Sequence, residues 1–213
     1  MPEEIILTED NMEDVAKYVG RRLTGKVAAI PTDTSYGLAA SAYDNFGVKK
    51  VFNIKMREQS KMLSVFVSSV DVIQSICVID EIAEKFIEIL PERLTLILKV
   101  KEPRRFAPGI VSPENKIGVR LPPYRFPPLL AREIGEPITA TSANISCEPP
   151  IYNPRLLKEK LTNIDIIVNA GELPPIPTST VIDVTKFPPV ILRSGPVSPQ
   201  EIRRRLKIDV LVQ

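Results

Sequence analysis

The chain has 213 residues, enough for one large α/β domain or two small ones, and its 44% hydrophobic and 25% charged residues are ordinary for a globular protein. It contains no histidine, which excludes Ser-His-Asp catalysis, Cys-His catalysis and zinc sites that need imidazole. Its two cysteines lie far apart and its formal net charge is +2, so neither a disulfide framework nor a strong nucleic-acid binder is expected.

The amino terminus, MPEEIILTEDN, is acidic and lacks the basic and apolar regions of a signal peptide. No apolar run approaches the about 20 residues that a membrane span needs. We therefore expect a cytoplasmic protein that does not contact membranes.

Strand and helix patterns alternate along the whole chain. In the first half we expect strands at 5–7, 27–30, 38–42, 62–67 and 94–100, and helices from Asn11 to Gly25, at 46–54 and at 81–90. After a proline-bearing loop at 101–115 we expect strands at 117–121, 137–141, 164–169, 179–184 and 190–193, helices at 129–134 and 156–161, and a last helix capped by Ser198. There is no linker between these elements, so we predict a single α/β domain over residues 1–213.

Residues 27–38, VAAIPTDTSYGL, join an apolar strand to a polar patch. Pro31 ends the apolar run, because proline supplies no N–H to a sheet. The patch places hydroxyl groups and the carboxylate of Asp33 at the end of a core strand, where α/β sheets open into a ligand crevice. Gly37 then permits a turn or the close approach of another group. The pattern indicates a ligand site, and a polar turn between two strands is the alternative.

Cations and hydroxyls recur later in the chain. Lys55, Arg57 and Lys61 follow a predicted helix at spacings that let three cations converge on one polyphosphate, with a solvated helix end as the alternative. Arg120 lies inside an apolar strand, where an arginine is costly unless it is paired, so we expect a bound anion or an internal carboxylate beside it. Residues 141–144, TSAN, form a second polar patch at a strand end.

Prolines and cysteines give weaker indications. The 21 prolines cluster at 122–128, 149–150, 174–177 and 188–189, and we interpret them as walls around a site or as rigid connectors. We expect Cys77 and Cys147 to be small core or lining residues.

Six motifs now share one explanation. They are VAAIPTDTSYGL at 27–38, KMREQSKMLSVFV at 55–67, IGVRLP at 117–122, PITATSAN at 137–144, STVIDV at 179–184 and ILRSG at 191–195. In this order they resemble the motifs of the YrdC-like family of threonylcarbamoyl-adenylate synthases. Chance supplies one such motif far more readily than six in order, and the length is similar to that of the short family members, which lack an extra C-terminal domain.

The resemblance implies a fold and a reaction. The fold is an open, twisted, mixed α/β sheet with flanking helices around a positively charged concave cavity. The reaction converts L-threonine, bicarbonate or CO₂, and ATP into threonylcarbamoyl-adenylate and pyrophosphate. A downstream transferase then moves the threonylcarbamoyl group to the adenosine next to the anticodon of tRNA, and weak binding of tRNA by this chain is compatible with its basic clusters.

The resemblance also implies roles for individual residues. ATP binding falls to Lys55, Arg57, Lys61, Ser142, Asn144 and Arg193, of which Lys55 and Arg57 also act catalytically. Threonine binding falls to Thr34, Arg120, the backbone at Ala140, and Ser179. No residue is implied as a metal ligand, because the sequence has no acidic cluster that resembles a metal cage, and Mg²⁺ would be held mainly by the ATP phosphates.

Three residues depart from the pattern of the family. Phe66 stands where some longer members have a histidine near the threonine, Cys147 stands where glycine is common, and Lys116 replaces a threonine and adds charge near Arg120. Two other functions fit the same features. One is a non-catalytic RNA-binding module that uses the same basic cavity, and the other is a nucleotidyl-transferring enzyme with a different acceptor acid.

Overall fold

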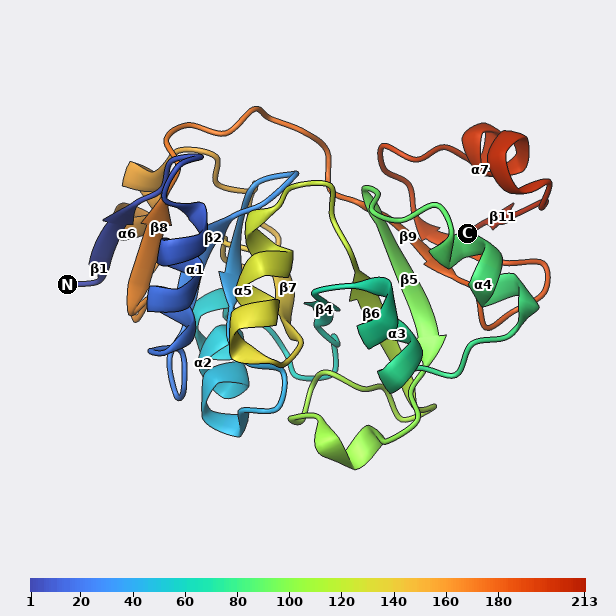
Figure 1. Cartoon of the computed structure of the whole chain (residues 1–213), viewed down its shortest axis with the longest axis horizontal. Helices are drawn as coiled ribbons and strands as arrows, with labels where there is room; N and C mark the ends of the chain where they lie inside the picture. Colours follow the sequence, from blue (N-terminus) through green and yellow to red (C-terminus); the bar gives the residue numbers. More distant parts are fainter.

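An 11-stranded mixed sheet runs the length of the structure, a computed structural model that describes all of residues 1–213 (Figure 1). The strands are β1 (Glu3–Ile6), β2 (Ala28–Pro31), β3 (Tyr36–Ala39), β4 (Ser64–Phe66), β5 (Leu94–Lys99), β6 (Lys116–Arg120), β7 (Ile138–Ser142), β8 (Ile166–Asn169), β9 (Thr180–Asp183), β10 (Val190–Arg193) and β11 (Leu211–Val212). Their order across the sheet is β1, β8, β2, β3, β7, β4, β6, β5, β9, β10, β11.

Parallel and antiparallel pairs both occur in the sheet. For example, β4 pairs with β6 in parallel and with β7 in antiparallel orientation. The sheet is open, with β1 and β11 as its two edges. The predicted α/β fold with an open mixed sheet is therefore confirmed.

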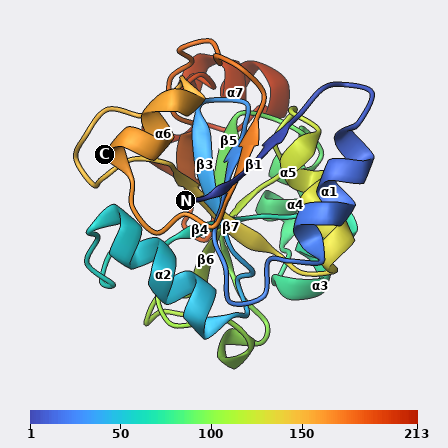
Figure 2. The same ribbon diagram turned by 90° about the vertical axis from the view of Figure 1, so that its left-hand side faces the viewer.

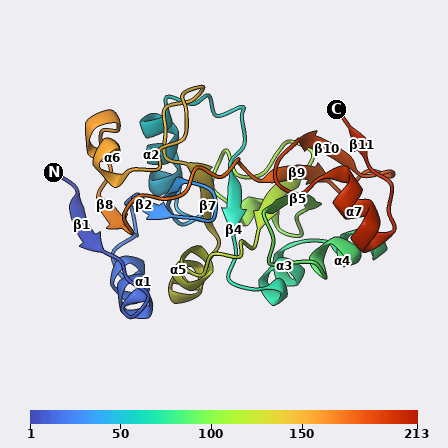
Figure 3. The same ribbon diagram turned by 90° about the horizontal axis from the view of Figure 1, so that it is seen from above.

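Helices cover both faces of the sheet. They are α1 (Met12–Gly20), α2 (Asn45–Lys55), α3 (Val70–Ile76), α4 (Glu81–Ile87), α5 (Phe126–Ile134), α6 (Pro154–Lys160) and α7 (Pro199–Leu206), with a 3₁₀ turn at Pro103–Arg105. Helices α2 and α6 lie on one face, and α1, α5 and α3 lie on the other (Figures 2 and 3). None of these helices combines the length and the apolar character that a membrane crossing requires.

The continuous apolar run of β2 is explained by this layering. Ala28 and Ile30 belong to the core cluster under α1 and α5, whereas Val27 and Ala29 belong to the larger cluster on the opposite face. Side chains of a strand alternate between the two faces, so a strand with helices on both faces has no polar position.

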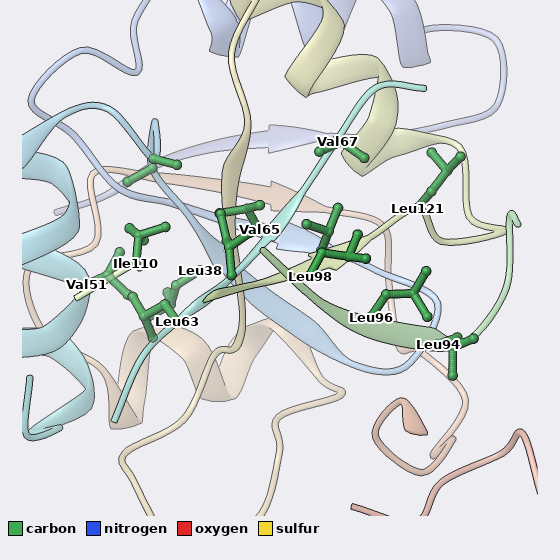
Figure 4. Close-up of a cluster of buried hydrophobic side chains, with 14 of the residues drawn as sticks. Leu38, Val51, Leu63, Val65, Val67, Leu94, Leu96, Leu98, Ile110 and Leu121 are labelled. Carbon is green, nitrogen blue, oxygen red and sulfur yellow. The ribbon is translucent and has the colours of Figure 1, made fainter. Parts of the chain in front are cut away.

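The larger cluster contains 41 buried residues and fixes the middle of the sheet. Leu94, Leu96 and Leu98 occupy alternate positions of β5 and belong to this cluster. Figure 4 shows them together with Leu38 and Val65. Each fully buried leucine contributes about 1.5–3 kcal/mol. The strands that carry the polar groups described below are thus held by a rigid apolar layer.

Helix ends follow the signals in the sequence. Ser198 accepts a hydrogen bond from the Glu201 N–H at 3.1 Å, which confirms the predicted cap of α7. Asp44 caps α2 by accepting from the Phe46 N–H at 2.9 Å. Gly135 ends α5 in the left-handed region, at φ +72°.

Several predicted boundaries were wrong. Helix α5 begins at Phe126 rather than at residue 129, because prolines fit the first turn of a helix. Helix α1 ends at Gly20 and does not reach Gly25. Helix α3, whose N-cap Ser69 accepts from the Val72 N–H, was not predicted. Strand β11 at the exposed edge was not predicted either.

Candidate functional site

A polar cavity of about 150 Å³ opens in the middle of the sheet, at the ends of several strands. It is lined by Thr32, Thr34, Ser35, Tyr36, Gly37, Arg57, Met62, Leu63, Ser64, Phe66, Thr95, Arg120, Ala140, Thr141, Ser142, Thr178, Ser179, Val181 and Arg193. Three arginines and no carboxylate belong to this lining. The cavity is smaller than the about 300–1,000 Å³ of a pocket that encloses a drug-sized ligand, so it matches an amino acid or part of a nucleotide.

The turn between β2 and β3 forms one wall and is held by its own hydroxyl groups. Thr32 Oγ1 donates to the Ser35 carbonyl at 2.7 Å and accepts from the Thr34 N–H at 3.2 Å. Gly37 lies against β7, where an added Cβ would be 3.0 Å from the Thr141 carbonyl oxygen. The sequence therefore fixes Thr34 in a preformed turn at the cavity, as a ligand site requires.

Tyr36, which also belongs to the lining, anchors the same turn. Its hydroxyl donates to the Gly171 carbonyl at 2.7 Å and accepts from the Ala170 N–H at 3.0 Å. Burial raises the pKa of Tyr36 to about 12, so the hydroxyl stays protonated. We assign Tyr36 a structural role.

Arg120 ends β6 inside the cavity and is paired with Asp33. Both carboxylate oxygens of Asp33 lie 2.9 Å from Arg120 Nη2, and the two side chains are 1% and 8% exposed. Burial lowers the pKa of Arg120, and the charge of Asp33 opposes that shift. The expectation that this arginine needs an internal carboxylate or a bound anion is confirmed, and the carboxylate is Asp33.

Arg57 is held by the turn that follows α2. Its Nε donates to the Lys61 carbonyl at 2.8 Å and its Nη2 donates to the Met62 carbonyl at 3.2 Å. Desolvation lowers the pKa of Arg57. Lys61 contributes only its backbone carbonyl to this contact. The residue is exposed and does not line the cavity. Of the two residues, Arg57 therefore faces the cavity.

Arg193 and Ser179 form another part of the lining. Arg193 donates through Nε and Nη2 to the Ser179 carbonyl at 3.1 and 2.8 Å, and through Nη2 to the Ser179 hydroxyl at 3.1 Å. Thr95 shares a hydrogen bond of 2.8 Å with the same hydroxyl. Partial desolvation is the largest cause that lowers the pKa of Arg193, and the positive charges of Arg120 and Arg57 lower it further. Three guanidinium groups thus act on one small volume, which favours an anionic ligand.

Lys55 and Asn144 lie beside the cavity and do not line it. Lys55 Nζ donates to the carbonyls of Ser142 and Asn144 and to Asn144 Oδ1, the latter at 3.4 Å. Asn144 Nδ2 donates to the carbonyls of Ile145 and Glu148 at 2.9 and 2.7 Å. Desolvation, and then the charge of Arg57, lowers the pKa of Lys55 to about 8. Both side chains hold the segment that follows Ser142, the last residue of β7.

The structure brings most of the predicted residues together. Those that line the cavity are Thr34, Arg57, Arg120, Ala140, Ser142, Ser179 and Arg193, and those that do not are Lys55, Lys61 and Asn144. Sequence reasoning missed Ser64 and Thr95. Both had a signal, because Thr95 is a lone hydroxyl in the apolar strand β5 and Ser64 is a lone hydroxyl in the apolar stretch 62–67 that contains β4.

The expectations about the prolines and the cysteines were only partly correct. No proline lines the cavity, so the interpretation of the prolines as its walls was wrong, and Pro122, Pro123 and Pro128 line a separate groove instead. Cys77 is buried as expected, but Cys147 is exposed. Cys147 also has a φ of +72°, a conformation that favours glycine.

The structure also shows where Phe66 and Lys116 lie, the other two residues that depart from the family pattern. Phe66 lines the cavity, and its ring centroid is 5.1 Å from Arg120 Cζ. Lys116 lies at the opposite end of β6 from Arg120, and its Nζ pairs with Asp183 at 2.9 Å. The expectation that Lys116 adds charge beside Arg120 was therefore wrong.

Comparisons with known proteins show the family of the chain. The model of the Sua5/YciO/YrdC family, described as "Telomere recombination", matches residues 22–195. A protein of Methanocaldococcus jannaschii named putative threonylcarbamoyl-AMP synthase is 33% identical over 93% of this chain and 94% of its own length. The threonylcarbamoyl-AMP synthase of Pyrococcus abyssi is 35% identical over 84% of this chain, which spans 53% of that longer protein.

Solved structures share the fold. Sua5 of Pyrococcus abyssi in complex with L-threonine has a TM-score of 0.82 and 31% identity over 99% of this chain, which covers 62% of the Sua5 chain. YciO of E. coli has a TM-score of 0.78 at 24% identity, over 93% of this chain and 99% of its own. With a family model that matches more than half of its length and relatives of this similarity, the chain belongs to the Sua5/YciO/YrdC family.

Proposed function

We propose that this protein synthesises L-threonylcarbamoyl-adenylate from L-threonine, bicarbonate or CO₂, and ATP, with release of pyrophosphate. The observation that carries the proposal is the convergence of Thr34, Arg57, Arg120, Ser179 and Arg193, from separate parts of the chain, on one cavity. Relatives named threonylcarbamoyl-AMP synthase and a related structure that contains L-threonine support it.

The two substrates are assigned to different groups of lining residues. Arg120 receives the carboxylate of threonine, beside Thr34, the backbone at Ala140, and Ser179. Arg57 and Arg193 receive the phosphates of ATP together with Ser142, because guanidinium groups match phosphate oxygens in geometry and charge. Lys55, Lys61 and Asn144 remain predicted ATP ligands. Lys61 is exposed, whereas Lys55 and Asn144 are buried, and all three lie outside the lining, beyond which a nucleotide too large for the cavity would extend.

The chemistry needs no covalent intermediate. The threonine amine adds to CO₂ and loses a proton, which gives a carbamate. A carbamate oxygen then attacks the α-phosphorus of ATP, the bond to the bridging oxygen breaks, and pyrophosphate leaves. Negative charge accumulates on phosphate oxygens, so Arg57 and Arg193 act mainly by electrostatic stabilisation.

Mg²⁺ belongs to the proposal through the nucleotide. The structure contains no group of three or more His, Cys, Asp or Glu residues placed to hold a metal ion, and Asp33 is already paired with Arg120. We therefore assign the metal no ligand from the protein. When bound by the ATP phosphates, Mg²⁺ would offset their charge.

The product is an activated acyl group, so a transferase must accept it. We propose that this partner passes the threonylcarbamoyl group to the adenosine next to the anticodon of tRNA. A non-catalytic RNA-binding module remains the alternative, and it predicts salt-dependent binding of structured RNA without chemistry.

Pyrophosphate release measures the reaction directly. The complete mixture of protein, ATP, Mg²⁺, threonine and bicarbonate is expected to release pyrophosphate, and omission of either threonine or bicarbonate is expected to abolish the signal. Replacement of threonine by serine tests the acceptor. A higher rate with serine would favour a different acceptor acid, and no release in the complete mixture would contradict the proposal.

A further inference from the structure

The ion pair between Asp33 and Arg120 uses only part of the guanidinium. Both hydrogen bonds run from Arg120 Nη2 to the two oxygens of Asp33. The Nε–H of Arg120 is buried and has no acceptor. Buried donors without a partner are rare, so this one requires an explanation such as a missing ligand or water.

The position of the guanidinium is fixed from several sides. The Phe66 ring lies near it, with its centroid 5.1 Å from Cζ. Asp33 sits in the turn that Thr32 organises, and its carbonyl accepts a hydrogen bond of 3.4 Å from Arg93 Nε. Asp33 therefore holds Arg120 from a backbone that is itself tethered, and it does so without lining the cavity.

We propose that Asp33 is a positioning residue that fixes Arg120 through Nη2 and thereby presents the remaining N–H groups of the guanidinium to the carboxylate of the amino-acid substrate. The inference rests on the proposed function, since it needs an amino acid in the cavity. Asp33 acts only through Arg120. The loss of Asp33 is thus expected to impair binding of the amino acid and to leave binding of the nucleotide to Arg57 and Arg193 intact.

The test compares threonine and ATP binding by titration calorimetry in the full chain, with each ligand added alone. Asp33→Asn keeps the shape of the side chain and removes its charge. It is expected to raise the Kd for threonine by about 10- to 100-fold, the range of one charge-assisted hydrogen bond, with the Kd for ATP unchanged. Asp33→Glu restores the charge and is expected to recover part of the threonine affinity.

Two further variants separate positioning from general damage. Asp183→Asn removes the charge from a partly buried ion pair between β6 and β9, Lys116–Asp183 at 2.9 Å, outside the cavity. It is expected to lower the melting temperature without changing the Kd for threonine. Arg120→Ala and the double variant Asp33→Asn/Arg120→Ala are expected to bind threonine equally weakly, because Asp33 has nothing to position once Arg120 is absent.

The outcomes distinguish this inference from the proposed function. If the parent protein binds no threonine, both are wrong. If the parent binds threonine and Asp33→Asn binds it as tightly or more tightly, only the positioning role is wrong. Equal losses of threonine and ATP affinity in Asp33→Asn, or a further loss in the double variant, would also contradict the role.

Discussion

Replacing Gly195 with alanine would push directly on the wall that holds Ser179. An added Cβ at this position would lie 2.4 Å from the Thr178 carbonyl oxygen and from the Thr180 nitrogen, and 2.7 Å from the Ser179 carbonyl carbon. Carbon contacts are normally about 3.5 Å, so one of the two segments must move by about 1 Å. All three obstructing atoms are backbone atoms, which cannot rotate away as a side chain could.

The expected effects are on stability and on binding. Overpacking of this kind costs about 1–3 kcal/mol and lowers the melting temperature of a chain of this size by about 2–12 °C. A shift of Ser179 also disturbs the Arg193 hydrogen bonds to its carbonyl and hydroxyl, at 2.8 and 3.1 Å. We therefore expect the Kd for ATP or for threonine to rise by about tenfold, the effect of one hydrogen bond.

Gly135→Ala is the matched control. Gly135 has a φ of +72° and no atom within 4 Å of an added Cβ, so alanine there is strained but touches nothing. The strain costs about 1–2 kcal/mol, a loss of stability that overlaps the one expected for Gly195→Ala. Thermal melting and calorimetry of both variants test the reasoning. If Gly195→Ala binds both ligands as the parent does, the cavity wall does not depend on this contact and the reasoning is refuted.

Four other variants are expected to show distinct effects. Arg57→Ala is expected to raise the Kd for ATP by about 10- to 100-fold with threonine binding unchanged, and Arg120→Ala to do the reverse; calorimetry that finds both variants equal to the parent would contradict the site assignment. Lys55 has a pKa lowered to about 8 from its ordinary 10.5, so the unfolded chain binds more protons between these values and folding stability rises with pH in this window. Denaturant unfolding at pH 7 to 10.5 is expected to show this effect as a stability difference between the parent and Lys55→Met that changes in favour of the parent as the pH rises, and an identical pH dependence of the two proteins would refute it. Cys147 adopts a left-handed backbone conformation, and Cys147→Gly relieves about 1–2 kcal/mol of strain there. This gain offsets the conformational entropy that glycine loses on folding. The melting temperature of the variant is expected to equal or exceed that of the parent, and a clear drop would show that the Cys147 side chain stabilises the loop.

Patterns within one element were the most informative part of the sequence. The unbroken apolar run of β2 indicated a strand covered on both faces, and the structure places its alternate residues in two different clusters. The Ser198 cap of α7 was equally local, since donor and acceptor lie three residues apart. Such features depend on backbone geometry alone, so one sequence suffices to predict them.

Partners distant in sequence could not be chosen in this way. The burial of Arg120 demanded a partner, but the chain has 26 acidic residues and nothing in the sequence paired Arg120 with Asp33, which lies 87 residues away. Lys55 looked like a free cation, yet its amine is taken by backbone carbonyls 87 and 89 residues away. Carbonyl groups occur at every position, so they leave no signal in the sequence that such a contact exists.

The spread of the lining residues along the polypeptide affects how the protein is made. Arg193 is translated after every other residue of the cavity, the first of which is Thr32. A nascent chain on the ribosome therefore has no complete binding site until the segment through Arg193 has emerged. Substrates then act only on the finished sheet, which they stabilise by mass action, and they do not guide its earlier folding steps.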